Sequence, residues 1–362
     1  MKILYLVDID FNQMSGVASK VCMQAKQWEK EGHTVILLST LSLSFFDLEG
    51  KRLSKPKILR NKGKLSFIIN VYKGSILLKY LLKDIDFDIV YMRYRIYDFF
   101  FKSAVQKKTI VAEMNTVYEQ ETKNRSYLSY LYYILFKNLS FNTINGFVCI
   151  SNEIKHITLK NNYKSLVLAN GIDTSLFQVE NRKRNVKPTL VFIGSPHQKW
   201  HGVDKIIFLS AKIKEFDFHI IGIAGNDTDN LFYHGYLSTE EFLPILKKSD
   251  IGIGSLAMHR LGINEASPLK SRQYLALGLP IIYAYHDTDI KDDLPFVLEL
   301  ENEENNIHKN IENIKNFVYN VFDNNNIQFE TQQFAKSTFD IVEKEQKRLQ
   351  FMNELLLNGD KK

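Results

Sequence analysis

The segment EASPLKSRQYLALGLPII (265–282) places a lysine where a helix is already electropositive. Ser267 is a favourable N-cap, Pro268 suits the first helical position, and Gly278 is a typical C-terminal stop. Lys270 then falls at the third helical position, within the first turn. The N-terminus of a helix carries about half a positive charge, so a cation there costs roughly 0.3–1 kcal/mol.

Two interpretations of Lys270 follow from this placement. Free backbone N–H groups and an ammonium group that meet at one point form an anion site, and phosphate is the usual anion. Alternatively, the side chain of Lys270 turns into solvent and avoids the helix dipole. The organisation of the rest of the chain separates the two.

Short apolar strands alternate with helix-length segments throughout the chain. Strands are expected at residues 2–7, 35–39, 88–92, 109–113, 146–150, 165–168, 189–194, 217–222, 231–234, 250–254, 279–284 and 295–299. Helices are expected at about 17–31, 66–83, 97–107, 122–141, 151–160, 203–214, 238–248, 268–277, 305–320 and 329–357. This alternation is typical of parallel sheets covered by helices on both faces, so we predict the α/β class.

The polar segment QVENRKRNVKPT (178–189) is the natural linker between two halves of the chain. We predict two doubly wound, Rossmann-like domains that face a cleft, spanning residues 1–178 and 186–339. The final helix, from about 340 to 362, is expected to pack back onto the first domain. Ligands of such sheets bind at the carboxyl ends of the strands.

The composition is that of a globular protein, with 362 residues of which 45% are hydrophobic and 24% charged. Cys22 and Cys149 are too few for a disulfide framework, and no Cys/His cluster has zinc-binding spacing. The opening MKILYLVDIDF lacks the features of a signal peptide, and no uncharged apolar run reaches the roughly 18 residues of a transmembrane helix. These features predict a cytoplasmic protein.

Five segments occur in a diagnostic order: NQMSGVASKV (12–21), EGHTVILLS (31–39), LANGIDTSLF (168–177), FIGSPHQKWHGVDKII (192–207) and the segment 265–282. With this ordered set, the chain resembles the retaining GT-B glycosyltransferases of glycosyltransferase family 4. The resemblance covers nearly the whole chain and is strongest from 168 to 284. It implies that a sugar moves from a nucleotide diphosphate to a hydroxyl acceptor with retention of the anomeric configuration.

The resemblance assigns roles to individual residues. Glu265 matches the first position of the family's Glu-x7-Glu motif, and Gln273 stands at the second, where a glutamate would hold the ribose hydroxyls. Ser195 and His201 stand where the family tends to have an arginine and a lysine near the diphosphate. The resemblance therefore leaves Lys270, with a further lysine at 199, to supply the positive charge.

Glu265 and Lys270 are the implied catalytic residues. Glu265 would face the donor sugar, and Lys270 would meet the diphosphate, which gains negative charge as the glycosidic bond breaks. The implied donor-binding residues are Gly16, Ser195, Lys199, His201, Gly202, Tyr236, Leu237, Ala266, Ser267, Pro268, Leu269 and Gln273, with Glu113 and Asn115 on the acceptor or sugar side. Ordinary turn and packing roles are the alternative for the members of this set that flank strands.

Neither a metal nor a cofactor is expected. The Asp-x-Asp strings at 8–10, 227–229 and 287–289 each offer only two carboxylates, which make a poor magnesium site, and the implied architecture usually needs no metal. The segment IGIAGNDT (221–228) is a partial glycine fingerprint that does not follow the first strand, so a nicotinamide cofactor is not expected. The nucleotide-sugar is a substrate.

The net charge of +6 is unevenly distributed. The run KRLSKPKILRNKGK (51–64) contains no acid, and the segment 125–141 is rich in Tyr, Leu and Phe. Basic and aromatic segments together suit an anionic membrane surface. The alternative is a solvated basic loop beside a core helix. No motif indicates nucleic-acid binding.

The main prediction is a retaining glycosyltransferase of surface polysaccharide synthesis, such as a capsule or lipopolysaccharide, acting on a glycan or lipid-linked acceptor at the inner face of the membrane. One alternative is a nucleotide-sugar epimerase or a phosphorylase on the same fold. Another is a non-catalytic partner protein with a decayed site, which the departures at Ser195, His201 and Gln273 allow.

Overall fold

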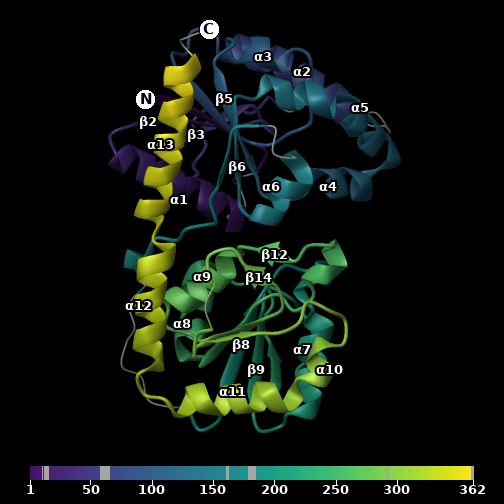
Figure 1. Cartoon of the computed structure of the whole chain (residues 1–362), viewed down its shortest axis with the longest axis vertical. Coiled ribbons are helices and arrows are strands. Elements are labelled where there is room, and N and C mark those ends of the chain that lie inside the picture. Colours follow the sequence, from purple (N-terminus) through teal and green to yellow (C-terminus); the bar gives the residue numbers. More distant parts are fainter. Residues whose placement is uncertain are drawn as a thin grey trace. The chain divides into compact units, whose positions relative to one another are not determined.

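The computed structural model describes residues 1–9, 11, 16–57, 66–159, 163–177, 185–291 and 293–359. The chain divides into two compact units, each with its own sheet (Figure 1). The first unit contains Met1–Ala169 and Ile341–Lys362, and the second contains Asn170–Asp340. The predicted α/β class with parallel sheets is confirmed.

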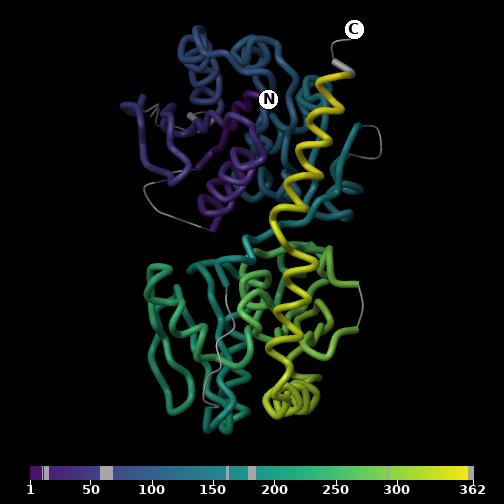
Figure 2. Tube along the Cα trace, turned by 90° about the vertical axis from the view of Figure 1, so that its left-hand side faces the viewer, coloured from purple at the N-terminus to yellow at the C-terminus, as the bar shows by residue number. Residues whose placement is uncertain are grey.

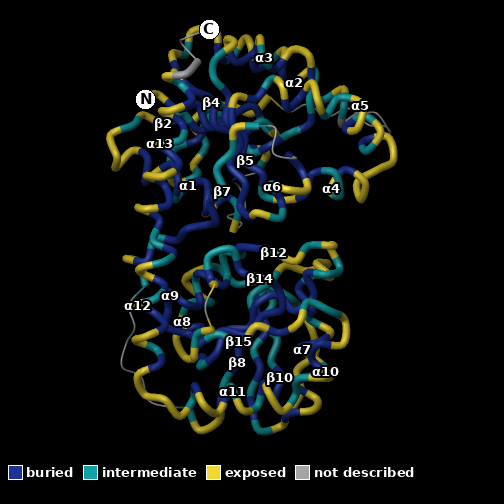
Figure 3. Tube along the Cα trace, viewed as in Figure 1, coloured by how far each residue is buried: buried dark blue, intermediate teal, exposed yellow. Residues whose placement is uncertain are grey.

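The first unit is built on a seven-stranded sheet in the order β3-β2-β1-β4-β5-β6-β7. The strands are β1 (Lys2–Val7), β2 (Thr34–Ser39), β3 (Ser44–Phe46), β4 (Ile89–Arg93), β5 (Thr109–Met114), β6 (Gly146–Cys149) and β7 (Ser165–Val167). All neighbours pair in parallel except β2 and β3. The central strands are almost wholly buried (Figure 3), because a parallel sheet is covered on both faces.

Seven helices of the described residues belong to this unit: α1 (Gly16–Lys30), α2 (Ser66–Leu81), α3 (Phe101–Ala104), α4 (Tyr118–Arg125), α5 (Tyr127–Thr143), α6 (Asn152–Leu159) and α13 (Ile341–Gly359). The single helix expected at 122–141 is two helices, because Ser126 is extended between them and its hydroxyl caps α5 at Ser129. The helix expected at 97–107 is shorter, since Gln106 and Lys107 adopt positive φ angles.

The second unit has a six-stranded parallel sheet in the order β10-β9-β8-β11-β13-β15. The strands are β8 (Thr189–Ile193), β9 (Asp217–Ile221), β10 (Leu231–Tyr233), β11 (Ile251–Ile253), β13 (Ile281–Tyr283) and β15 (Val297–Glu299), with a separate pair β12 (Glu265–Ala266) and β14 (His286–Asp287). The helices are α7 (Val203–Lys212), α8 (Thr239–Lys248), α9 (Leu269–Ala276), α10 (Asn306–Lys309), α11 (Ile311–Asp323) and α12 (Ile327–Phe339).

The division between the units lies at Ala169 and Asn170, before the segment 178–186 at which the sequence places it. The reason is local hydrogen bonding. The backbone N–H of Asn170 donates to Ser267 Oγ at 2.9 Å, and Ile172 forms a bridge with Asp340. Part of the predicted linker, residues 178–184, lies outside the described residues.

The C-terminal helix α13 completes the first unit and lies beside α1 (Figure 2). Arg348 on α13 is buried and pairs with Glu345 at 2.8 Å and with Glu113 on β5 at 3.0 Å. Lys20 of α1 pairs with the same oxygen of Glu113 at 3.0 Å. Trp28 of α1 donates its indole N–H to Glu345 at 2.7 Å. A buried ionic network therefore joins α13 to α1 and the sheet.

The Glu113 carboxylate depends on these partners. Burial alone would raise the pKa of Glu113, but the positive charges of Lys20 and Arg348 outweigh it and hold the pKa well below its usual range. The carboxylate therefore stays ionised, and removing one cation leaves buried negative charge without compensation.

We predict that Arg348→Met lowers the free energy of unfolding of the first unit by roughly 3–5 kcal/mol. The chain has two tryptophans, and only Trp28 lies in this unit. Urea unfolding followed by fluorescence in a Trp200→Phe background isolates its transition. The matched control, Lys26→Met, breaks the exposed pair with Glu49 in the same unit and should cost at most about 1 kcal/mol. Equal losses in both variants would show that the buried network is not a determinant of stability.

Candidate functional site

The sheet order of the second unit defines a switch point. Strand β8 lies between β9 and β11, so the chain leaves β8 toward one side of the sheet and later returns to the other. In open α/β sheets, ligands bind outside the carboxyl ends of the strands at such a point. The two loops that leave β8 and β11 meet here: Leu256 N–H donates to the carbonyl of His201 at 3.1 Å.

Gly202 allows the close approach of these loops. It adopts φ +73°, in the left-handed region, and precedes α7. A Cβ at this position would lie 2.9 Å from Leu256 Cβ. A residue with a side chain would therefore strain the backbone and push the two loops apart.

The start of α9 differs from the sequence prediction. Ser267 is not the N-cap, because its hydroxyl accepts the N–H of Asn170. Pro268 is extended (ψ 136°) and occupies the N-cap position, and α9 begins at Leu269. Lys270 is consequently the second helical residue rather than the third, and it still lies in the first turn.

The side chain of Lys270 does not turn into solvent. Its Nζ lies 3.1 Å from Nδ1 of His201 and 4.1 Å above the ring centroid of Phe192, the fourth residue of β8. Trp200 also contributes, with its ring 5.5 Å from Nζ. Lys270 forms no ion pair within the described residues, so it is a partly buried amine among aromatic rings without a carboxylate.

His201 is buried and neutral. Burial is the main cause that lowers the pKa of His201 to about 2, and Lys270 adds to the effect when its amine is charged. Its Nε2 accepts the backbone N–H of Ser195 at 3.2 Å, so the ring proton is placed on Nδ1. Nδ1–H can donate to Lys270 only if that amine is uncharged, because an ammonium group has no acceptor.

The electrostatics agree with this hydrogen-bond pattern. Burial lowers the pKa of Lys270 well below its usual value. Burial favours the uncharged amine, because an ammonium group would have aromatic rings but no carboxylate among the described residues to offset its desolvation. An anion near Nζ would restore the charge. The arrangement is therefore suited to the reversible binding of an anionic group.

Helix α9 is held rigidly against the sheet. The hydroxyl of Tyr274 accepts the N–H of Ile193 at 2.7 Å, and Ser271 Oγ lies 2.6 Å from the hydroxyl of Tyr285. These contacts fix the first turn of α9 relative to β8, which carries the ring beneath the lysine.

The predicted donor-binding residues are distributed unevenly. The structure joins Ser195, His201 and Lys270 through hydrogen bonds. Lys199 is exposed in the turn before His201, and Gln273 is partly buried on α9. Of the other predicted residues, Glu265 and Ala266 form β12, and Pro268 and Leu269 lead into α9. Tyr236 and Leu237 lie in the loop after β10. The Tyr236 side chain is 80% exposed.

Gly16, Glu113 and Asn115 belong to the first unit. A Cβ at Gly16 would meet no described atom within 4 Å, so this glycine is not required by close packing. The Glu113 carboxylate is engaged by two cations, and Asn115 donates to it at 3.0 Å. Asn115 also accepts from Lys20 at 2.9 Å.

Two adjoining cavities lie at the carboxyl edge of this first sheet. One of about 110 Å³ is lined by Arg93, Glu113 and Asn115 among others, and the second, of about 370 Å³, shares Arg95 and Arg125 with it. Arg93 is partly buried, and its side chain has no hydrogen-bond or ion-pair partner in the part of the chain that the structure describes.

Sequence reasoning missed Phe192, Arg93 and Arg272. Phe192 and Arg93 lie within or at the end of strands, where the alternation of side chains could have placed them on the site edge. Arg272 lies two residues beyond Lys270, and no local pattern identifies its partners.

The aspartates of the three Asp-x-Asp segments do not form a metal site among the described residues. Asp287 and Asp289 both pair with Arg272, which is fully buried. Asp227 accepts the N–H of Tyr233 at 2.8 Å, and residue 10 lies outside the described residues. Among the described residues, no group of three or more His, Cys, Asp or Glu could hold a metal ion.

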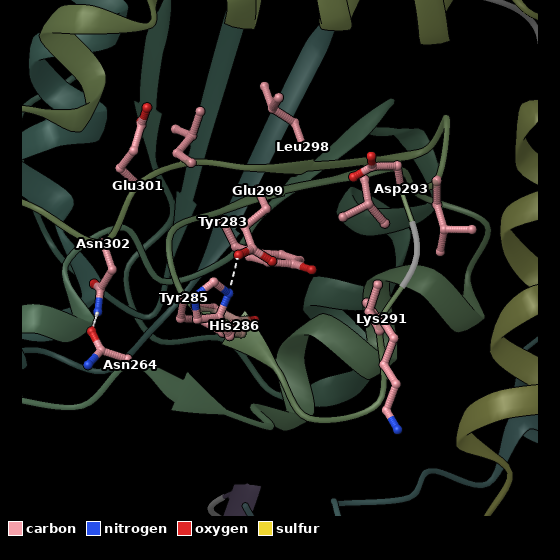
Figure 4. A pocket seen from close by; sticks show the side chains of 14 residues that line it. Asn264, Tyr283, Tyr285, His286, Lys291, Asp293, Leu298, Glu299, Glu301 and Asn302 are labelled. Atoms are coloured by element: carbon pink, nitrogen blue, oxygen red, sulfur yellow. Dashed lines mark hydrogen bonds and ion pairs between the residues drawn. The ribbon is translucent and has the colours of Figure 1, made fainter. Parts of the chain in front are cut away.

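A cavity of about 790 Å³ lies elsewhere in the second unit, beside β13 and β15 (Figure 4). His286 pairs with Glu299 at 2.6 Å near its centre, and Asn302 donates to Asn264 at 3.1 Å. None of the predicted site residues lines this cavity. We therefore assign the site from the Lys270 geometry and not from cavity size.

Comparison with solved structures identifies the fold. No protein-family profile and no curated protein sequence matches the chain. Sucrose-phosphate synthase from Thermosynechococcus elongatus superposes with a TM-score of 0.74 at 10% identity, covering 99% of this chain and 100% of that one. The chain has the GT-B glycosyltransferase fold.

Other GT-B structures are similar over comparable lengths. A glycosyltransferase from Rickettsia africae gives a TM-score of 0.71 at 16% identity, covering 98% of both chains. The lipopolysaccharide outer core galactosyltransferase WaaB gives 0.67 at 14% identity, covering 99% of this chain and 100% of that one. No helix of the described residues is sufficiently long and apolar to cross a membrane.

We predict that Lys270 titrates below the ordinary lysines of this GT-B chain, because burial disfavours its charged form. Reductive methylation with ¹³C-formaldehyde and an NMR pH titration would measure each lysine, with the Lys270 resonance assigned by its loss in Lys270→Met. The exposed Lys336 serves as the reference. A Lys270 resonance that titrates together with Lys336 would contradict the neutral-amine assignment.

Proposed function

We propose that this protein is a retaining glycosyltransferase that moves a sugar from a nucleotide-diphosphate-sugar to a hydroxyl of a glycan or lipid-linked acceptor. The observation that carries the proposal is the Lys270 amine, which lies without a counter-charge at the first turn of α9 and at the switch point of a GT-B domain. A diphosphate is the anion that this chemistry releases.

Lys270 would act on the leaving group. As the bond between the anomeric carbon and the diphosphate breaks, negative charge grows on the phosphate oxygens. The ammonium form of Lys270, together with the free N–H groups at the start of α9, would stabilise that charge. Because the amine is held over Phe192 before the donor binds, little reorganisation is needed during the reaction.

His201 would position Lys270 and not supply a second charge. It stays neutral, and it accepts the N–H of Ser195 while it contacts the amine. Lys199 and Gly202 would complete the phosphate-binding loop. Gln273 would accept and donate hydrogen bonds to the ribose, but without the charge assistance that a glutamate gives.

Glu265 would bind hydroxyls of the donor sugar and stabilise positive charge at the anomeric carbon. It lies on β12, five residues before Lys270. Tyr236 and Leu237 would contact the nucleobase. We propose that this reaction uses neither a metal ion nor a cofactor.

The acceptor would bind to the first unit, at the carboxyl edge of its sheet. Asn115 and Arg93 line a cavity there, and Gly16 would lie on the same side as the first residue of α1. Because Glu113 is committed to its two cations, it would position neighbouring side chains and not contact the acceptor. We propose a role in surface polysaccharide synthesis, on the cytoplasmic side of the membrane.

A non-catalytic partner protein is the second candidate. The observation that favours it is that Gln273 stands where the resemblance leads one to expect a glutamate. The Gln273 side chain has no hydrogen-bond partner among the described residues. An epimerase or a phosphorylase on the same fold would release a different product, so product analysis separates them from a transferase.

We predict that Lys270→Ala and Lys270→Met each lower turnover about 100- to 1,000-fold, or roughly 2.7–4 kcal/mol, because the departing diphosphate loses a positioned cation. Lys270→Met keeps the contact with Phe192, so its fold should be unchanged. Steady-state kinetics and thermal unfolding would test both. Lys336→Ala is the control, and near-native turnover of Lys270→Met would show that the cation is dispensable.

We predict that Glu265→Gln reduces turnover. The nucleotide alone should still bind to this variant, because Glu265 is proposed to contact the sugar of the donor. A thermal-shift screen with UDP-, GDP- and ADP-sugars would identify the donor. Hydrolysis of that donor, followed by NMR of the first-formed anomer, would test retention. Inversion would contradict the proposed stereochemistry, and binding without any hydrolysis or transfer would favour the non-catalytic candidate.

A further inference from the structure

Helix α5 of the first unit exposes an apolar face. Six large apolar side chains on this helix are exposed: Tyr127, Leu128, Leu131, Ile134, Leu135 and Leu139. Only Ser129, Tyr133, Ser140 and Phe141 are buried. The alternative that residues 125–141 form a core helix therefore holds for one side of α5 only, where Tyr133 and Phe141 join the core. The six side chains of the other side stay exposed among the described residues.

Helix α2 extends the same surface. Ile69, Ile76 and Tyr80 are exposed on one side of α2, and Lys73 and Lys79 are exposed beside them. Figure 3 shows exposed positions along both helices. An exposed helix face of a globular protein is normally polar, so a face of isoleucine, tyrosine and lysine is unusual.

Aromatic contacts hold the two helices together. The hydroxyls of Tyr72 on α2 and Tyr132 on α5 lie 2.7 Å apart. Phe99, which is 55% exposed, lies between the helices, with ring centroids 6.4 Å from Tyr72 and 5.5 Å from Phe136. The exposed residues of α2, α5 and the 99–100 turn thus form one surface, which we call the α2–α5 face.

The charge of the α2–α5 face is positive only. Neither α2 nor α5 contains an Asp or Glu residue. Lys73 and Lys79 have no hydrogen-bond or ion-pair partner in the described part of the chain. Of the nearby acids, Asp98 is buried beside Arg95, and Glu119 pairs with Lys137. No carboxylate on either helix competes for the two free lysines.

We propose that the α2–α5 face binds an anionic membrane surface, with its leucines in the headgroup boundary and its lysines on lipid phosphates. Apolar residues combined with lysine and interfacial tyrosine are typical of such contacts. A second copy fits less well, because two copies of a face without acids on either helix would bring positive charges together with no carboxylate to pair with them. Protein interfaces are depleted in lysine.

The inner side of α2 supports this assignment. Asn70, Val71, Gly74 and Leu78 line the cavity of about 370 Å³ that also includes Arg95. One helix therefore connects the α2–α5 face to the cavity that adjoins the candidate acceptor cavity. The inference rests on the proposed function only where it explains why the protein would bind a membrane, namely to reach a lipid-linked acceptor. Membrane binding itself is measured in an assay that does not depend on sugar transfer.

The test is sedimentation of the full chain with vesicles of phosphatidylcholine alone or mixed with phosphatidylglycerol. We expect binding to the anionic vesicles that weakens with added salt. Leu131→Gln/Leu135→Gln should weaken this binding at least about tenfold, because two apolar contacts with the lipid are lost. The control Leu176→Gln/Phe329→Gln removes two exposed apolar side chains of the second unit and should bind as the unaltered protein does.

A second pair of variants leaves α5 unaltered, so its result does not depend on whether the leucine variant folds correctly. Lys73→Glu/Lys79→Glu should abolish the preference for anionic vesicles, whereas Lys336→Glu/Lys347→Glu should keep it. Unchanged binding by both test variants would overturn the proposal, and so would a stable dimer that the leucine variant dissociates. Transfer to a soluble acceptor should be unaffected in all four variants, so loss of transfer bears on the proposed function alone.

Discussion

The absence of a counter-charge for the Lys270 amine within the described residues is the constraint around which the site is organised. Its neighbours are an aromatic ring at 4.1 Å and a neutral imidazole at 3.1 Å. A carboxylate in their place would neutralise the ammonium group permanently and exclude an anionic ligand. The surrounding contacts preserve an amine whose charge depends on what binds beside it.

A comparison of two lysines shows what this constraint means. Lys20 in the first unit is also buried, but Glu113 lies 3.0 Å from its amine, and a C-terminal helix brings Arg348 to the same carboxylate. That lysine is part of a closed network that joins three elements. Lys270 faces no such acid. Removal of a lysine from solvent therefore has two different consequences: the ion pair of Lys20 stabilises the fold, whereas the Lys270 amine has no carboxylate partner among the described residues.

The lack of a counter-charge for Lys270 offers an explanation for the residues at which this chain departs from the glycosyltransferase pattern. His201 is neutral at the position where the resemblance leads one to expect a cation, and in the proposed function Lys270 on α9 would supply the positive charge once an anion binds. The buried pair of Arg272 with Asp287 and Asp289 uses the acids that otherwise suggest a metal. Within three residues of α9, Arg272 is thus fixed by buried ion pairs, whereas Lys270 has no counter-charge among the described residues.

The local sequence determined the class of fold, because the alternation of apolar strands and helices has few architectural solutions. It also determined that a lysine lies in the first turn of α9, since Pro268 and Gly278 limit where that helix can begin and end. The strands β3, β12 and β14 were not predicted. The strands β12 (EA) and β14 (HD) have two residues each and contain charged or polar side chains, so no apolar run marks them.

Only the tertiary structure decided what surrounds these residues. Ser267 was expected to cap α9, but Asn170, 97 residues earlier, takes its hydroxyl. The partners of Lys270 and Arg272 come from other strands and loops, and Glu113 meets a residue 235 positions later. Sequence patterns report periodicity within a segment, whereas burial, pKa and ion pairing depend on which segments meet. That physical difference explains why the position of the lysine was predictable and its lack of a counter-charge was not.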